Sequence, residues 1–207
     1  MPGTMSEADL VVDLKASLND AKTVFAADDS DFKRQLKTAA LDLGRKRPRT
    51  LVGSFTLVAD QAGYAPLPAL FLAYKSHLWG IAPRAAPKPW ESHYTGRLPD
   101  ARVAEEGVVR KLTLDRPPTA AQISVLGEEF RYYYSAGHEV AAAAENTTVL
   151  AGDRALLILR TQAEAMRELA MRNVMKPIMV REGLSSQPRN GTPSFLHQAL
   201  MDEFERA

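Results

Sequence analysis

The four histidines are the side chains best suited to bind a metal ion or to move a proton, but their positions favour neither role. They are scattered along the chain, and none has a partner at a metal-ligand spacing such as His-x-x-x-His. We therefore expect neither a metal site nor a cofactor. The four are His77, His93, His138 and His197.

The other patterns that could support catalysis have simpler structural explanations. The sequence contains no glycine-rich phosphate loop, no GxSxG nucleophile motif and no dinucleotide fingerprint. The adjacent glutamates at 105–106 and 128–129 would face opposite sides of a strand, so we expect them in solvent rather than paired as acid and base. The acidic run Asp28–Asp31 lacks the glycine and the distal glutamate of an EF-hand and fits helix capping better. These patterns predict a protein that is not an enzyme.

Four cations within five positions form the strongest candidate for a charged contact. This basic cluster consists of Arg45, Lys46, Arg47 and Arg49. It could bind phosphates, a partner subunit, or the negative end of the helix that precedes it. Acidic and basic residues almost cancel over the chain, at 25 and 26, so the global charge does not favour nucleic acid. The sequence leaves these three interpretations open.

The aromatic segment EEFRYYYSAGHEV, residues 128–140, is best interpreted as a half-buried strand. Alternation places Phe130, Tyr132 and Tyr134 on one face and Tyr133 on the other. A platform for base stacking would place exposed aromatic residues in a basic groove, whereas two glutamates begin this segment. The pattern therefore predicts structural packing, with the histidine as a polar cap where the strand ends.

Length and composition indicate an ordinary folded protein. Its 207 residues are enough for a hydrophobic core, and 45% of them are hydrophobic and 25% charged. The absence of cysteine excludes disulfides, thiolate metal sites and a cysteine nucleophile, and it fits synthesis in a reducing cytoplasm. No apolar run approaches the roughly 20 residues of a membrane span, and no secretory signal is evident. We expect no contact with a membrane.

Helical periodicity predicts two helices at the start of the chain and two in its last third. The first two run from residue 6 to about 26 and from 28 to 44. A long third helix spans Gly152–Asn173, which contains no internal glycine or proline. The composition of Glu182–Gly191 is that of a linker, and a last helix then runs from Thr192 to about 206.

Between these helices the hydrophobic period changes to two, which predicts strands. We expect them within residues 50–58, 108–115 and 128–136, joined in a small antiparallel sheet. Residues 60–99 are rich in proline and glycine and are expected to form a long exposed loop, apart from one strand or short helix in LFLAYKSHLWG. The predicted fold class is α+β, mainly α: a helical bundle with a small antiparallel β-sheet and an extended C-terminal tail or helix.

Two domains follow from this organisation. Residues 1–181 would form the helical bundle with the inserted sheet and the long loop, and residues 182–207 would form a linker and a C-terminal docking segment. A helix at the end of a flexible tether suggests that it docks onto another molecule.

Four phrases of the sequence, together with the order of the elements, resemble one protein family. The phrases are DFKRQLKTAALDLGRKRPRTLVGSFTLVADQAGYAPLP, LTLDRPPTAAQ with EFRYYYSAGHEV, LAGDRALLILRTQAEAMRELAMRN, and QPRNGTPSFLHQALMDEFERA. They span most of the chain and are structural phrases rather than catalytic signatures. The family is that of the head-to-tail adaptor, or connector, proteins of tailed bacteriophages, particularly the neck proteins of podophages and related prophages.

The resemblance implies a structural protein of the virion, made in the host cytoplasm and located in the neck between capsid and tail. Such a protein forms a homo-oligomeric ring, a dodecamer that matches the twelvefold portal protein, and the genomic DNA passes through its channel. The opposite side of the ring offers a docking surface to a tail or nozzle protein. In relatives a C-terminal segment reaches into the portal. Its counterparts here are Arg189, Phe195, Leu196, Leu200 and Phe204.

Three aromatic residues are the expected contacts with a neighbouring subunit or with the tail side. Trp79 and Trp90 flank the proline-rich part of the long loop, and Tyr133 lies on the second face of the aromatic strand. The basic cluster would face either an acidic portal surface or the DNA. The alternative is a nucleic-acid-binding or DNA-packaging accessory protein, which would rest on the basic cluster and the last helix. Acidic residues interleaved with the cations favour the adaptor.

Overall fold

The described residues of the chain form two compact units. The helical unit comprises the sequence up to Arg47 and from His138 onward, and the β unit comprises Pro48–Gly137. The β unit is therefore an insertion within the sequence of the helical unit. The domain boundary expected between residues 181 and 182 lies outside the described residues. The computed structural model describes residues 5–64, 66–80, 88–91, 94–173 and 192–207.

Local sequence signals account for where the helices of the helical unit begin. Ser6 and Asp9 exchange hydrogen bonds in a capping box ahead of α1. The Thr192 hydroxyl accepts a hydrogen bond from the Phe195 amide ahead of α5. The first predicted helix is split, because Asn19 takes a positive φ of 49° and a 3-10 helix follows it. The elements are α1 (Glu7–Leu18), η1 (Asn19–Val24), α2 (Ser30–Lys46), η2 (Ala144–Asn146), η3 (Ala151–Asp153), α4 (Arg154–Arg172) and α5 (Pro193–Arg206).

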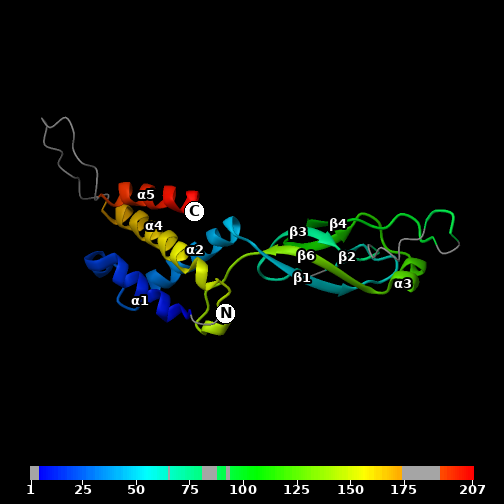
Figure 1. Ribbon diagram of the computed structural model, residues 1–207, viewed down its shortest axis with the longest axis horizontal. Helices are drawn as coiled ribbons and strands as arrows, with labels where there is room; N and C mark the ends of the chain where they lie inside the picture. The colour runs from blue at the N-terminus through cyan, green and yellow to red at the C-terminus, as the bar shows by residue number, and fades with distance from the viewer. Residues whose placement is uncertain (1–4, 65, 81–87, 92–93, 174–191) are drawn as a thin grey trace, which may run out of the picture. The chain divides into compact units, whose positions relative to one another are not determined.

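The apolar faces of these four α-helices meet in one core, with α4 in contact with the other three. Leu14 of α1, Leu36 of α2 and Leu157 of α4 are fully buried there. Helix α5 runs alongside α4 (Figure 1) and contributes Phe204 to the same core. The apolar residues that recur at helical spacing in the sequence therefore form a stripe on each helix, and each stripe packs against a neighbouring helix.

The β unit contains two antiparallel sheets rather than the single sheet expected. Their strand orders are β1-β6-β3 and β2-β5-β4. The α+β class is confirmed, and the helix α3 between β5 and β6 is an element that the sequence analysis did not predict. The elements are β1 (Arg49–Thr56), β2 (Gly63–Tyr64), β3 (Phe71–His77), β4 (Ala101–Glu106), β5 (Val109–Leu114), α3 (Ala120–Leu126) and β6 (Glu129–Ala136).

Aromatic side chains fill the core of the β unit. Phe130, Tyr132 and Tyr134 of β6 are buried, which confirms the predicted alternation of this strand. The ring of Phe55 stacks on Phe130 with centroids 4.9 Å apart and on Tyr64 at 4.2 Å. Such pairs stabilise the core beyond the effect of the area that they bury.

The tight fit of this aromatic core yields a first prediction at Gly53. A β-carbon at Gly53 would lie 2.6 Å from Cζ of Tyr132, whereas one at Gly63 would meet nothing closer than 3.8 Å. We expect Gly53→Ala to destabilise the chain by about 1–3 kcal/mol through overpacking. Gly63→Ala is the matched control, and urea unfolding measures both. Equal effects of the two substitutions would contradict the packing of Tyr132 against β1.

A polar network ties α2 to the C-terminal half of α4. The Glu168 carboxylate accepts hydrogen bonds from Gln35 at 2.8 Å and from Arg34 at 3.0 Å. A third comes from Arg172 at 2.5 Å. Burial acts to raise the pKa of Glu168, but these donors outweigh it and the pKa is lowered.

Asp31 joins the same network from the first turn of α2. Its carboxylate accepts from the backbone amide of Ala26 at 3.0 Å and from Arg172 at 2.8 Å. The Ala26 amide, with Arg34 and Arg172, lowers the pKa of Asp31 to about 2. The charged form of Asp31 is therefore the one that the fold stabilises.

Acid should consequently destabilise the chain between about pH 4 and pH 2. Because the pKa of Asp31 is lower in the folded chain than its ordinary value, its contribution is present above this window and is lost as the pH falls through it. The measurement is the free energy of unfolding by urea across the window, for the wild type and for Asp31→Asn. The wild type should lose more stability than the variant. Parallel pH profiles would show that Asp31 does not act in this way.

Candidate functional site

Helix α5 is held to the helical unit at its C-terminal end. The Phe204 side chain is 2% exposed, and Lys46 Nζ lies 4.9 Å from the centre of its ring. The same Lys46 ammonium donates to the Phe204 carbonyl oxygen. Arg47 donates to the backbone oxygen of Ala207 and to Asp153 Oδ1, each at 2.6 Å. A buried ring and two cations therefore fix the last turns of the helix.

The N-terminal half of α5 presents apolar side chains to solvent. Phe195 and Leu196 are 40% and 37% exposed, and Leu200 is half-buried. A groove of about 380 Å³ lies beside Leu196 and Leu200, between α5 on one side and α1 with η1 on the other. The side chains that make it apolar are Leu18, Ala21, Met166, Leu169, Leu196 and Leu200. We call this surface the α5 groove.

The predicted portal-docking residues thus divide into two groups. Leu196 and Leu200 line the α5 groove, and Phe195 is exposed on the same half of the helix. Phe204 is part of the core and is not available to another molecule while α5 lies on α4. Arg189 lies outside the described residues. Sequence reasoning missed the opposite wall of the groove, because its residues come from helices far away in the sequence and carry no motif.

Every cation of the basic cluster has a partner within its own unit. Arg45 pairs with Asp42 at 3.2 Å and remains exposed to solvent. Lys46 and Arg47 hold α5, and in the β unit Arg49 Nε donates to a backbone carbonyl oxygen at 3.2 Å. Lys46 and Arg47 would have to give up these contacts to bind a phosphate. The geometry therefore favours the structural interpretation of the cluster.

The three aromatic residues expected at contacts with other molecules lie in different environments. Trp79 is 3% exposed in the core of the β unit, and its Nε1 donates to the Gly127 carbonyl oxygen at 2.8 Å. It is therefore not a surface residue of a long loop, as the sequence suggested. Trp90 is 77% exposed, with Lys88 Nζ 5.4 Å from its ring centre. Tyr133 is half-buried on the outer face of the sheet β1-β6-β3.

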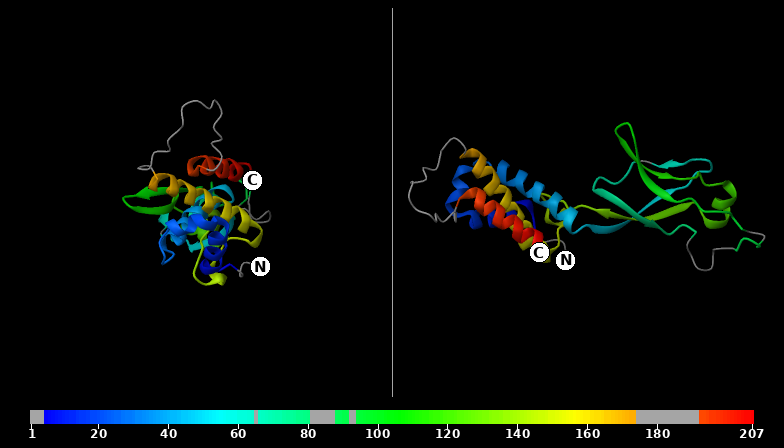
Figure 2. Two further views of the ribbon diagram at one scale, coloured as in Figure 1. Left: turned by 90° about the vertical axis from the view of Figure 1, so that its left-hand side faces the viewer. Right: turned by 90° about the horizontal axis from the view of Figure 1, so that it is seen from above.

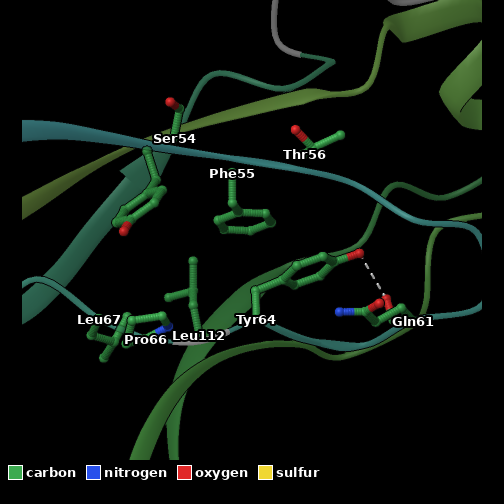
Figure 3. Close-up of a pocket in the computed structure, with 9 residues that line it drawn as sticks. Ser54, Phe55, Thr56, Gln61, Tyr64, Pro66, Leu67 and Leu112 are labelled. Carbon is green, nitrogen blue, oxygen red and sulfur yellow. Dashed lines mark hydrogen bonds between the residues drawn. The ribbon is translucent and has the colours of Figure 1, made fainter.

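A second hollow, of about 230 Å³, lies in the β unit beside β1. Phe55 points from β1 toward Tyr64 and Leu112 on the facing sheet (Figure 3). The Tyr64 hydroxyl donates to the Gln61 carbonyl oxygen at 3.0 Å, which fixes the ring. We call this hollow the β1 pocket.

The three described histidines are buried or half-buried and serve hydrogen bonding; His197 Nδ1, for example, lies 2.8 Å from the Ala163 carbonyl oxygen. The ring nitrogens of His138 lie 3.1 Å and 3.0 Å from the carbonyl oxygens of Thr148 and Arg47. These contacts fit the predicted polar cap after β6. His77 Nδ1 lies 2.7 Å from the Tyr74 hydroxyl. Burial lowers the pKa of His77 and raises that of Tyr74 to about 12.

No model of a known protein family matches the chain, and no curated protein matches it either. Among the described residues, no group of three or more acidic or histidine side chains is placed to hold a metal ion. The described helices include none that is long and apolar enough to cross a membrane.

The two phenylalanines of α5 lie in different environments, so replacing each by alanine should change the stability of the chain by different amounts. Phe204→Ala should cost about 3–5 kcal/mol, because it leaves a cavity in the helical core. Phe195→Ala should cost less than about 0.5 kcal/mol, since its side chain is exposed and lies outside the core. Urea unfolding of both variants measures the difference. Similar losses for the two variants would show that α5 is not packed as described.

Proposed function

We propose that the chain is a head-to-tail adaptor subunit of a tailed bacteriophage, a structural protein of the virion neck. Its copies form a dodecameric ring between the portal protein and a tail or nozzle protein. The genomic DNA passes through the channel of this ring. The role requires surfaces that bind other proteins and no catalytic group.

The distribution of the family-like phrases over the fold supports this proposal. The first phrase, residues 31–68, covers nearly all of α2 together with β1 and β2, and the second, within residues 112–140, covers half of β5, all of β6 and the start of α3. The third covers α4, and the last includes α5. The resemblance thus concerns the frameworks of both units and not a single surface feature.

The observation that carries the proposal is the α5 groove. A monomeric protein rarely exposes a continuous apolar surface without a binding partner. Here Leu196 is exposed at the margin of an apolar groove, and Phe195, the preceding residue, is exposed as well. Such a groove has the chemistry that accepts the apolar face of an amphipathic helix. We assign this groove to a helix of the portal protein.

This assignment changes the role of one expected docking residue. The proposed apolar contacts with the portal are Leu196 and Leu200, which line the groove, and Phe195, which is exposed on the same half of α5. Phe204, together with Lys46, acts indirectly by keeping α5 in place. Portal binding then requires no release of α5 from α4.

The tail side and the DNA-binding alternative receive different support. Trp90 is exposed and remains the proposed contact with the tail or nozzle protein. A DNA-packaging accessory protein would need free cations, whereas the basic cluster is bound within its own units. This arrangement supports the adaptor over the accessory protein.

The proposal is tested by mixing the purified chain with the portal protein of the same phage and imaging the product. We expect a ring stacked on the narrow end of the portal. Leu196→Asp should abolish this complex without unfolding the chain, because it places a charge in the α5 groove.

Leu41→Asp is the matched control, since Leu41 is an exposed leucine of α2 that does not line the groove. It should leave portal binding unchanged. Equal binding by both variants would refute the assignment of the groove to the portal. DNA binding without portal binding would favour the packaging accessory protein.

A further inference from the structure

Strand β1 forms an edge of its sheet, and no strand among the described residues pairs with its outer side. Its pairing with β6 runs without interruption from Arg49 opposite Ala136 to Thr56 opposite Glu129. The opposite edge strand, β3, is broken by two register shifts. Edge strands are normally protected by such bulges, by proline or by charged side chains. Between Thr50 and Thr56, β1 has none of these.

The backbone of β1 offers hydrogen-bonding groups on this open side. The Leu57 amide donates to the Glu128 carbonyl oxygen. Because hydrogen-bonded pairs alternate along an antiparallel ladder, every second residue before Leu57 bonds to β6 through its backbone. The backbone N–H and C=O groups of the residues between them point away from β6. Within the described part of the chain, no strand pairs with that side. The outward-facing residues are Thr50, Val52, Ser54 and Thr56, all of them exposed and uncharged.

The β1 pocket lies directly beside this edge. Ser54 and Thr56 of the strand line it, together with Tyr64 and Leu67 (Figure 3). An extended segment that paired with the edge could therefore place one side chain in the pocket. This combination of free backbone groups and an adjacent pocket is the arrangement used in recognition by strand addition.

The β4–β5 hairpin of the same chain has the complementary features. Gly107 supplies the positive φ, 62°, that its two-residue turn requires, and Val108 at the tip is 101% exposed. Turns normally carry polar residues or glycine, so a fully exposed valine is unusual there. Figure 2 shows this hairpin, in bright green, projecting from the rest of the β unit.

The charges of the hairpin allow it to approach a neutral edge. Glu105 pairs with Arg110 at 3.5 Å, and Glu106 pairs with Lys111, so the acidic residues are neutralised within the hairpin itself. The outward-facing residues of β1 carry no charge. Contact between the two surfaces would therefore bury no unpaired charge, which would otherwise be costly.

We propose that β4, the edge strand of this hairpin, pairs in one copy of the chain with the free edge of β1 in a second copy and brings Val108 at the hairpin tip to the β1 pocket. The contact joins two different surfaces, so each copy can bind one neighbour with its edge and another with its hairpin. Contacts of this kind generate closed rings or open chains. The contact between β1 and the hairpin would supply the subunit interface that the proposed adaptor ring requires. Its formation does not depend on the portal.

Disulfide trapping tests the contact with this chain alone. Because the sequence has no cysteine, Val108→Cys and Ser54→Cys each introduce a single thiol. After the two variants are mixed and mildly oxidised, we expect the mixed dimer to exceed, several-fold, the product of Val108→Cys with Val125→Cys. Val125 is a matched control, since it is an exposed valine of α3 in the same unit.

Two results of this experiment would overturn the proposal. One is a mixed dimer that forms no faster than the control product. The other is a dominant Ser54→Cys homodimer, which would mean that two β1 edges pair with each other. Neither result bears on the α5 groove, so this proposal and the proposed function can fail separately.

A second experiment tests the backbone pairing. Because the Ser54 amide faces outward, Ser54→Pro removes a donor from the open edge and none from the pairing with β6. In the background of this substitution, trapping of Val108→Cys by Thr56→Cys should be lost while circular dichroism shows a folded chain. If the proline variant does not fold, Ser54→Lys is used in its place, because a charge on the edge also opposes pairing and should also abolish the trapping. Trapping that persists in a folded variant would overturn the pairing.

Discussion

The packing of three helices against α4 is the interaction on which the helical unit depends. A buried charge fixes the orientation of α4, because Arg160 binds Asp42 of α2 at 2.6 Å and Glu164 on the next turn at 3.2 Å. A charge removed from water must be paired in this way, and loss of either partner would leave it uncompensated. With α4 held against α2, its remaining surface receives α1 and α5. The α5 groove exists because these two helices contact α4 without closing over it.

The central strand β6 has the corresponding role in the β unit. Its inner face carries the aromatic residues of the core, and its two neighbours, β1 and β3, become the edges of the sheet. Only one of these edges is interrupted by bulges. The proposed surfaces therefore belong to different units: the α5 groove would bind the portal, while the β1 edge and the hairpin would bind other copies of the chain. Each surface can be changed by substitutions that leave the core of its unit intact.

Periodicity in the sequence was sufficient for α2, α4 and β6, because each has one face buried along its whole length. Phe195 and Phe204 lie nine residues apart, on opposite faces of α5, and the sequence could not show which of these faces packs on α4. Their difference arises from Lys46 and from α4, which the sequence does not bring together. Trp79 was misplaced for a related reason, since it packs among residues distant in the sequence and its indole bonds the Gly127 carbonyl oxygen. The second sheet includes a two-residue strand, β2, too short to show any alternation.

Hydrogen exchange along α5, in the free chain and in the complex with portal, tests the central claim most directly. If α5 is part of the helical unit and offers its first turns to the portal, the amides of its last turns should exchange about as slowly as those of α4 before portal is added. Portal binding should then slow exchange around Phe195 and Leu196 and leave the turn that contains Phe204 unchanged. Exchange of the whole of α5 at the rate of an unfolded peptide in the free chain would contradict the account, because α5 would then be a free tail that orders only on binding.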